Sequence, residues 1–165
     1  MLFNSEKVQK SLVSKIKHVR LCDMSYWEKL KVLKLYSQER RRERYCIIFL
    51  WKLSQGLVSG YNSIDFSPTY NRTGRRALQL SVATGPAVLR KAKEDSLAVK
   101  GVALFNCMPA TLRNSDHGDI SMFKNHLDHY LSNIPDQPTI PGLGRAAETN
   151  SLLHQVPLYE LSRDR

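Results

Sequence analysis

The residues in this sequence whose types and spacing suggest chemistry are clustered arginines. The clusters are Arg40, Arg41, Arg42 and Arg44, then Arg72, Arg75 and Arg76, and then Arg90, Lys91 and Lys93. A guanidinium group is planar and presents paired N–H donors, which fit phosphate better than the point charge of a lysine. Three separate clusters of one sign predict contact with a polyanion. The candidate nucleic-acid-binding residues are Arg40, Arg41, Arg42, Arg44, Arg72, Arg75, Arg76 and Lys91.

Tyrosines lie between these clusters, at Tyr45, Tyr61 and Tyr70. Their rings have the chemistry to stack on unpaired bases. A different interpretation is that the first arginines pair with Glu39 and Glu43 on a solvated helix face and that Tyr45 belongs to the core. In the binding interpretation Arg40, Arg41, Arg44, Arg75 and Arg76 contact backbone phosphates, and five contacts predict a slope of log affinity against log salt of about −4.

Catalytic and metal-binding patterns are weak in comparison. His126 and His129 are three residues apart, but Asp128 does not share their face and the sequence has no C-x-x-C pair. It has no G-x-S-x-G elbow, P-loop or dinucleotide fingerprint either. Asp116 and Asp119 are better explained by a polar loop followed by a helix cap than by two-metal chemistry. We therefore expect no catalysis by this chain alone and no cofactor in it.

The charge distribution favours the same kind of partner. The 165 residues include 25 Lys and Arg against 15 Asp and Glu, a net charge of +10. Residues 1–60 carry 13 basic and 5 acidic side chains, whereas residues 101–165 carry 5 and 7. A basic first part indicates nucleic acid (RNA, DNA or a hybrid) ahead of a membrane surface.

The chain shows no sign of a membrane or secretory location. Its longest purely apolar run has seven residues, Tyr45 to Trp51, far short of the ~20 that span a bilayer. The first residues have no secretory pattern, and three widely spaced cysteines fit a reducing compartment. We expect an intracellular protein of the nucleus, the cytoplasm or both.

Capping signals and apolar periodicity predict the helices. Helices are expected over 5–18, over 25–36 with Ser25 and Glu28 as a capping box, over 38–53 with Ser37 as cap, and from Asp119 to Pro135. Gly56 is a natural stop for the third of these. The apolar run from Tyr45 to Trp51 is also compatible with a buried strand, but the length of the segment favours a helix.

The middle and the end of the chain have different patterns. Alternation in Leu78, Leu80 and Val82 predicts a strand, and Leu97 and Val99 a second one. Residues 135–144 contain three prolines and two glycines and predict a linker. The expected fold is mainly α with a small β element (α+β): about four helices, a two-strand ribbon near 77–100 and an extended C-terminal tail. The expected domains are 1–134, a basic helical domain, and 135–165, a Pro/Gly linker and flexible tail. The predicted core comprises Trp27, Leu30, Leu33, Ile47, Ile48, Trp51, Leu104, Phe105, Phe123, Leu127 and Leu131.

Several strings in a fixed order resemble a known family. They are EKVQK (6–10), YWEKLKVLKLYSQERRRERY (26–45), WKLSQGLV (51–58), VALFNCMP (102–109) and FKNHLDHYLSNIPDQP (123–138). Together they resemble the C-terminal, post-thumb region of the reverse transcriptase of non-LTR, LINE-type (jockey-like) retrotransposons. The resemblance covers roughly residues 5–155.

This resemblance implies a segment of an RNA-directed DNA polymerase. The parent protein would be an enzyme, but the polymerase's Asp-Asp catalytic motif has no counterpart in this chain. The implied role is sequence-independent binding of template–primer or target DNA, with the missing polymerase thumb or another protein as a further partner. The alternatives are a protein–protein interaction module and a retroelement remnant without function.

Overall fold

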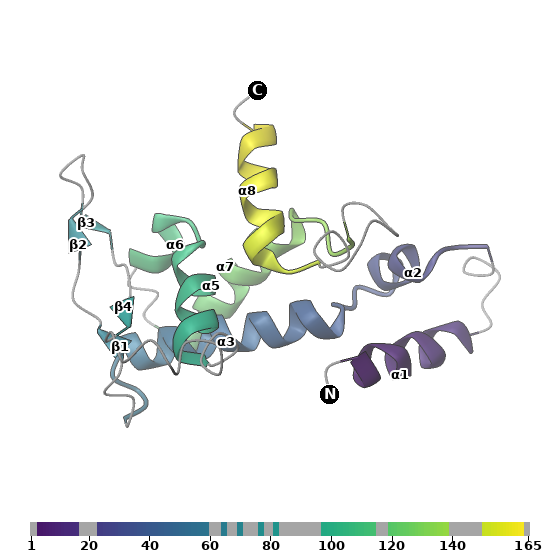
Figure 1. Cartoon of the computed structure of the whole chain (residues 1–165), viewed down its shortest axis with the longest axis horizontal. Helices are drawn as coiled ribbons and strands as arrows, with labels where there is room; N and C mark the ends of the chain where they lie inside the picture. Colours follow the sequence, from purple (N-terminus) through teal and green to yellow (C-terminus); the bar gives the residue numbers. More distant parts are fainter. Residues whose placement is uncertain are drawn as a thin grey trace, which may run out of the picture.

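The computed structural model describes residues 3–16, 23–59, 64–65, 69–70, 76–77, 81–82, 97–114, 119–138 and 150–163. The helix α3 (Gln38–Ser54) runs along the long axis of the molecule (Figure 1). The helices α1 (Phe3–Ser14) and α2 (Tyr26–Val32) lie near the N-terminal end of α3, as Figure 1 shows. Along one side of α3 lie α5 (Val102–Asn106), α7 (Ile120–Ser132) and α8 (Leu152–Arg163), with α6 (Ala110–Asn114) beside α5.

The predicted helix starts are confirmed where local capping decides them. Ser25 accepts a hydrogen bond from the backbone N–H of Glu28, whose side chain accepts from the N–H of Ser25, so the capping box is complete. Ser37 caps α3 by accepting from the N–H of Arg40 at 3.1 Å. After α3 the chain reverses at Gly56, whose φ of 69° is in the left-handed region that favours glycine.

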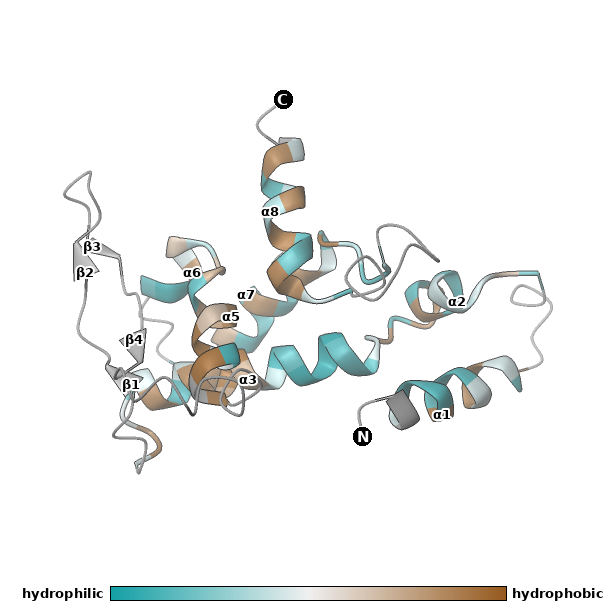
Figure 2. Cartoon of the chain, viewed as in Figure 1, coloured by the Kyte–Doolittle hydropathy of each residue, from teal (hydrophilic) through white to brown (hydrophobic). Residues whose placement is uncertain are grey.

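The core lies between the second half of α3 and the helices packed on it. It contains Ile47, Leu50 and Trp51 of α3, and the Trp51 ring stacks on Phe123 of α7 with centroids 4.7 Å apart. Figure 2 shows this division: the first half of α3 is hydrophilic and its second half faces the hydrophobic residues of α5 and α7. Nine of the eleven predicted core residues are buried, whereas Trp27 and Leu33 remain partly exposed.

The predicted α+β class with a two-strand ribbon near 77–100 is wrong. The described residues are mainly helical, and Leu97–Gly101, where the second strand was expected, is a π-helical turn labelled η3. This turn packs closely on α3: a Cβ added at Gly101 would lie 3.2 Å from a methyl group of Leu50. Two alternating apolar residues are too short a pattern to outweigh that packing.

The β structure among the described residues is limited to four strands of two residues each. They are β1 (Ile64–Asp65), β2 (Thr69–Tyr70), β3 (Arg76–Ala77) and β4 (Ser81–Val82). The pairing is antiparallel, β1 with β4 and β2 with β3. Of the predicted strand at 78–82, the structure describes only β4. Its partner is β1 rather than the predicted strand at 97–99.

The prediction of an extended C-terminal tail is also wrong. Residues 152–163 form α8, which buries Leu152 and Val156 in the core. The apolar pattern of this segment is weak, and Pro157 lies within the helix, so neither periodicity nor propensity predicts that it packs. None of the described helices has the length and hydropathy needed to cross a bilayer.

Candidate nucleic-acid interface

The four arginines at the start of α3 lie on two different faces of the helix. Successive residues of an α-helix are rotated by about 100°, so Arg40 and Arg44 share one face and Arg41 and Arg42 lie away from it. The first pair faces the packed side of α3, and the second pair faces outward. The first arginine cluster is therefore divided between the interior and the surface.

Arg40 is fully buried, with 0% of its surface exposed. Its Nη2 donates to the carbonyl oxygen of Pro135 at 2.7 Å, and its Nε lies 3.8 Å from a carboxylate oxygen of Asp136. Burial lowers the pKa of Arg40, and the nearby carboxylates of Asp136 and Glu43 oppose that shift. The expectation that Arg40 contacts phosphate is therefore corrected, because its guanidinium is buried within the protein and out of reach of an external phosphate.

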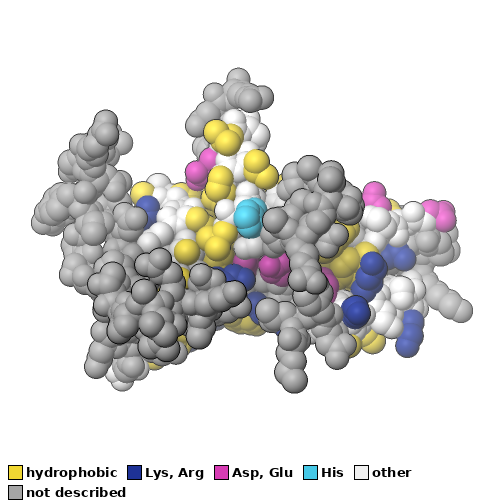
Figure 3. Space-filling view, viewed as in Figure 1, with side chains coloured by type: hydrophobic (Ala, Val, Ile, Leu, Met, Phe, Trp, Pro, Cys, Tyr) yellow, Lys and Arg dark blue, Asp and Glu magenta, His cyan; other side chains and the backbone are white. Residues whose placement is uncertain are grey.

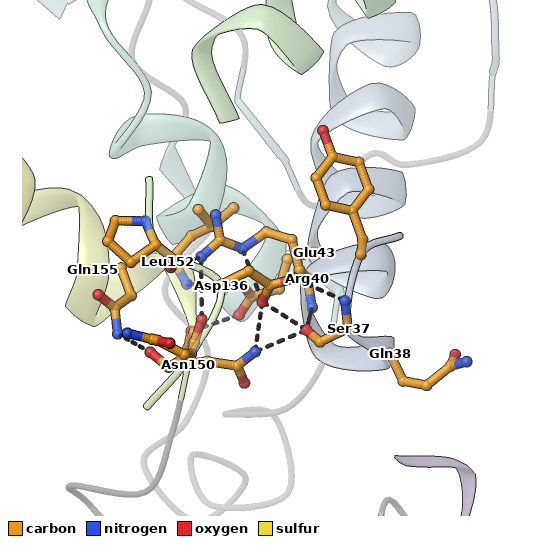
Figure 4. Close-up of polar contacts among 12 residues, drawn as sticks. Ser37, Gln38, Arg40, Glu43, Asp136, Asn150, Leu152 and Gln155 are labelled. Atoms are coloured by element: carbon orange, nitrogen blue, oxygen red, sulfur yellow. Dashed lines mark hydrogen bonds and ion pairs between the residues drawn. The ribbon is translucent and has the colours of Figure 1, made fainter. Parts of the chain in front are cut away.

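Asp136 connects the start of α3 to the C-terminal part of the chain. Figure 4 shows its carboxylate accepting from the N–H of Ser37 and from the Ser37 hydroxyl, both at 2.7 Å. The same carboxylate accepts from the Asn150 amide at 2.6 Å, and that amide also donates to the Ser37 hydroxyl at 2.7 Å. We call Ser37, Arg40, Glu43, Asp136, Asn150 and Ser151 the polar junction.

Glu43 caps α8 from the other side of this junction. Its carboxylate accepts from the Ser151 hydroxyl at 2.5 Å and from the N–H of Leu152 at 2.8 Å. The Nζ of Lys100 lies 3.9 Å from Oε1 of Glu43. Burial raises the pKa of Glu43, and the two hydrogen bonds oppose that rise. The two segments thus exchange carboxylates. Asp136 of the C-terminal segment binds the start of α3, and Glu43 of α3 binds the start of α8.

The N-terminal helix adds a second carboxylate at the start of α3. Glu6 accepts from the N–H of Gln38 at 2.8 Å and from the Tyr26 hydroxyl at 2.6 Å. The negative charges of Glu6 and Asp136 therefore interact favourably with the positive N-terminal end of the α3 dipole. This end does not act as an open anion site, because protein carboxylates already occupy its amide groups.

Arg44 is held by an ion pair on the flank of the same helix. Its Nε and Nη2 donate to the two carboxylate oxygens of Asp128 at 2.5 and 2.6 Å, a bidentate arrangement. The Tyr36 hydroxyl donates to the same carboxylate at 3.2 Å, and burial together with Asp128 raises the pKa of Tyr36 to about 12. The hydrogen bonds to Asp128 raise the pKa of Arg44. Two of the predicted phosphate ligands thus have carboxylate partners.

The other predicted residues differ in what is described of them. Arg42 is exposed and donates to the Ser5 hydroxyl at 2.6 Å, and Arg41 is partly exposed. Arg76 lies in β3, opposite Tyr70 of β2. The side chain of Arg76 and the residues Arg72, Arg75 and Lys91 lie outside the described part of the chain. Their contact with nucleic acid stays a prediction.

Sequence reasoning overlooked the lysines of α1 and α2. Lys7, Lys10, Lys31 and Lys34 are exposed and Lys29 is partly exposed. These helices pack on each other, and Lys10 lies 5.8 Å from the ring centroid of Tyr26. Figure 3 shows Lys and Arg side chains gathered over this end of the molecule. The three lysines of EKLKVLK (28–34) are the feature of the sequence that indicates this surface.

We call the surface cations of α1, α2, the turn after α2 and the start of α3 the basic surface. It comprises Lys7, Lys10, Lys29, Lys31, Lys34, Arg41 and Arg42. Two nearby carboxylates already serve the protein: Glu6 binds the start of α3, and Glu28 completes the capping box of α2. The seven cations outnumber these two carboxylates, so the charge on this part of the surface is predominantly positive.

Metal binding finds no support in the described residues, which contain no group of three potential ligands among His, Cys, Asp and Glu. His126 and His129 both lie on exposed positions of α7. No family model, curated protein or solved structure matches this chain. The resemblance to the retrotransposon reverse transcriptase consequently stays a prediction.

Proposed function

We propose that this chain binds the phosphate backbone of RNA, DNA or an RNA–DNA hybrid without reading its sequence. It would do so as the C-terminal segment of a retrotransposon RNA-directed DNA polymerase, inside the cell in the nucleus or the cytoplasm. Catalysis belongs to the parent polymerase, and this segment needs no cofactor. The observation that carries the proposal is the basic surface, in which three packed helices and the turn after α2 present seven cations.

The physical basis is the release of counterions from a polyanion. Each lysine or arginine that neutralises a phosphate releases condensed cations, so affinity falls as salt rises. If about five of the seven cations reach phosphates at once, the slope of log affinity against log salt is about −4 for a duplex. Lysines on mobile stems contact phosphates but do not read base edges, which makes the binding independent of sequence.

The test measures binding of fluorescent RNA–DNA hybrids of two unrelated sequences by anisotropy, from low to high salt. We expect both sequences to bind alike, with a slope of about −4. The variant K7Q/K10Q/K31Q/K34Q should bind far more weakly and with a shallower slope. The substitution K124Q on α7, remote in sequence from the basic surface, is the control and should leave binding nearly unchanged.

Two results would overturn the proposal. One is absence of binding by the folded wild type at low salt. The other is an unchanged affinity in the quadruple variant, with circular dichroism and thermal unfolding showing that it folds like the wild type.

A second candidate function is a protein–protein interaction module, favoured by α1. Val8 and Leu12 are four residues apart and exposed on one face of this helix, and Ile16, two residues beyond its end, is exposed as well. Such an apolar stripe at a surface is typical of protein contact sites. Light scattering distinguishes the candidates: oligomers that form without nucleic acid and dissociate in the variant L12Q would favour this second function.

A further inference from the structure

The outer face of α3 carries an exposed tyrosine next to the basic surface. Tyr45 is 60% exposed, so the interpretation that it belongs to the core is wrong. It follows Arg41 by four residues and Arg42 by three, which places all three side chains on neighbouring positions of the helix surface. Along the axis, Arg41 is about 6 Å from Tyr45, roughly one helical turn.

The same face continues beyond Tyr45. Phe49 follows four residues later and is partly exposed, and Lys52 follows after three more. Cationic and aromatic side chains therefore succeed one another along this face over about 16 Å of helix. The buried face of α3, with Arg40, Glu43 and Ile47, lies on the opposite side and anchors the helix in the core.

A fixed cation adjoins the Tyr45 ring. The guanidinium carbon of Arg44 lies 5.9 Å from the ring centroid, and the bidentate ion pair with Asp128 holds that guanidinium in place. A cation over an aromatic ring contributes a modest attraction that favours one ring position. Because α3 is packed and Arg44 is held, an incoming ligand loses less free energy in ordering this site than it would on a loop.

We propose that Tyr45 is a stacking platform for an unpaired base of single-stranded nucleic acid, with Arg41 and Arg42 binding the adjacent phosphates. This inference rests on the proposed backbone binding and names the form of nucleic acid that this part of the surface prefers. The cations supply contact with any strand, whereas the ring adds affinity only where a base face is free.

A duplex cannot use this platform, because its bases stack on each other and present only their edges in the grooves. The ring therefore distinguishes single strands from duplexes although the phosphates are the same. Stacking on one aromatic side chain is worth enough that its removal weakens single-strand binding about tenfold. It is also insensitive to salt, since no counterion is released by the stacked base.

The experiment compares a fluorescent 12-nucleotide oligouridylate with a duplex that has the same number of phosphates. Wild type, Y45F and Y45A are measured at several salt concentrations. We expect Y45A to weaken binding of the oligouridylate about tenfold with an unchanged salt slope, and to leave duplex binding within twofold. Y45F should bind both as the wild type does, because the ring is retained. The control L161A removes a side chain on α8 that is similarly exposed, at 66%, and should change neither affinity.

The outcomes separate this inference from the function on which it rests. If Y45A binds the oligouridylate as tightly as wild type, or loses affinity for both ligands equally, the stacking platform does not exist while backbone binding stands. A loss in L161A equal to that in Y45A overturns it in the same way. If the folded wild type binds neither ligand at low salt, the proposed function itself fails.

Discussion

The polar junction and the basic surface each contain arginines from the first turns of α3, but these arginines differ in what they contact. In the junction, Arg40 lies among backbone carbonyls and the carboxylate of Asp136, and no part of it reaches water. On the basic surface, one and two residues later in the same helix, Arg41 and Arg42 face outward. A run of arginines is therefore not a unit of function, because helical rotation assigns each member its own surroundings.

The comparison predicts its largest effect at Arg40. The substitution R40A removes a buried cation and leaves Asp136 with an uncompensated charge, which should lower the free energy of unfolding by about 3–5 kcal/mol. Urea denaturation measures this loss. The neighbouring substitution R41A is the control and should change stability by less than about 0.5 kcal/mol. Equal stability of the two variants would mean that Arg40 is not enclosed as described.

A smaller effect is expected at Glu43, which tests whether the junction needs a charge or only an acceptor. E43A leaves the Ser151 hydroxyl and the N–H of Leu152 without their partner, at a cost of about 1–3 kcal/mol. E43Q keeps an oxygen acceptor and should cost less than E43A. Denaturation of the two variants at neutral pH measures the difference, and an equal loss in E43Q and E43A would show that the negative charge, rather than an acceptor alone, is required.

The pH dependence at Glu43 follows from its raised pKa. Because the folded protein holds this proton more tightly than the unfolded chain, Glu43 stabilises the fold most below its ordinary pKa of 4.5. That contribution is lost as pH rises through the pKa of the folded state. The stability of wild type relative to E43Q should therefore fall as pH is raised from 4.5 towards neutrality, when urea denaturation is compared at each pH. A relative stability that rises over this interval contradicts the raised pKa.

The smallest effect on stability, and a clear one on binding, is expected at the outward arginines. R41Q/R42Q should unfold within about 0.5 kcal/mol of wild type. It should also bind nucleic acid more weakly, with a salt slope reduced by about 2, one for each lost phosphate contact. Anisotropy titrations at several salt concentrations measure both quantities. If the slope is unchanged, these two side chains do not contact phosphates.

Local signals predicted the helix starts well. The capping box at Ser25, the cap at Ser37 and the turn at Gly56 each depend on residues within four positions, and all three are present in the structure. The apolar face of α7, with Phe123 and Leu127, was predicted from its periodicity and is buried. These features need no information from distant parts of the chain.

Long-range partners explain what the sequence could not predict. Arg40 is buried because Asp136 and Asn150 come to it from the C-terminal segment, and neither pattern nor spacing links these residues to α3. The π-helical turn before α5 likewise depends on contact with Leu50. For the candidate site, a binding role of the exposed Arg41 and Arg42 stays a prediction, and their separation from the buried Arg40 depends on which side of α3 is packed.

The junction between Ser37 and Asp136 also sets an order of events during biosynthesis. These two residues are 99 positions apart. At ribosomal elongation rates of about 5–20 residues per second, α3 would wait on the order of 5 to 20 s before its carboxylate partner is made. During that interval Arg40 has neither the Pro135 carbonyl nor the Asp136 carboxylate that it contacts in the folded protein. The contacts that bury its guanidinium therefore become available only after the C-terminal segment has been synthesised.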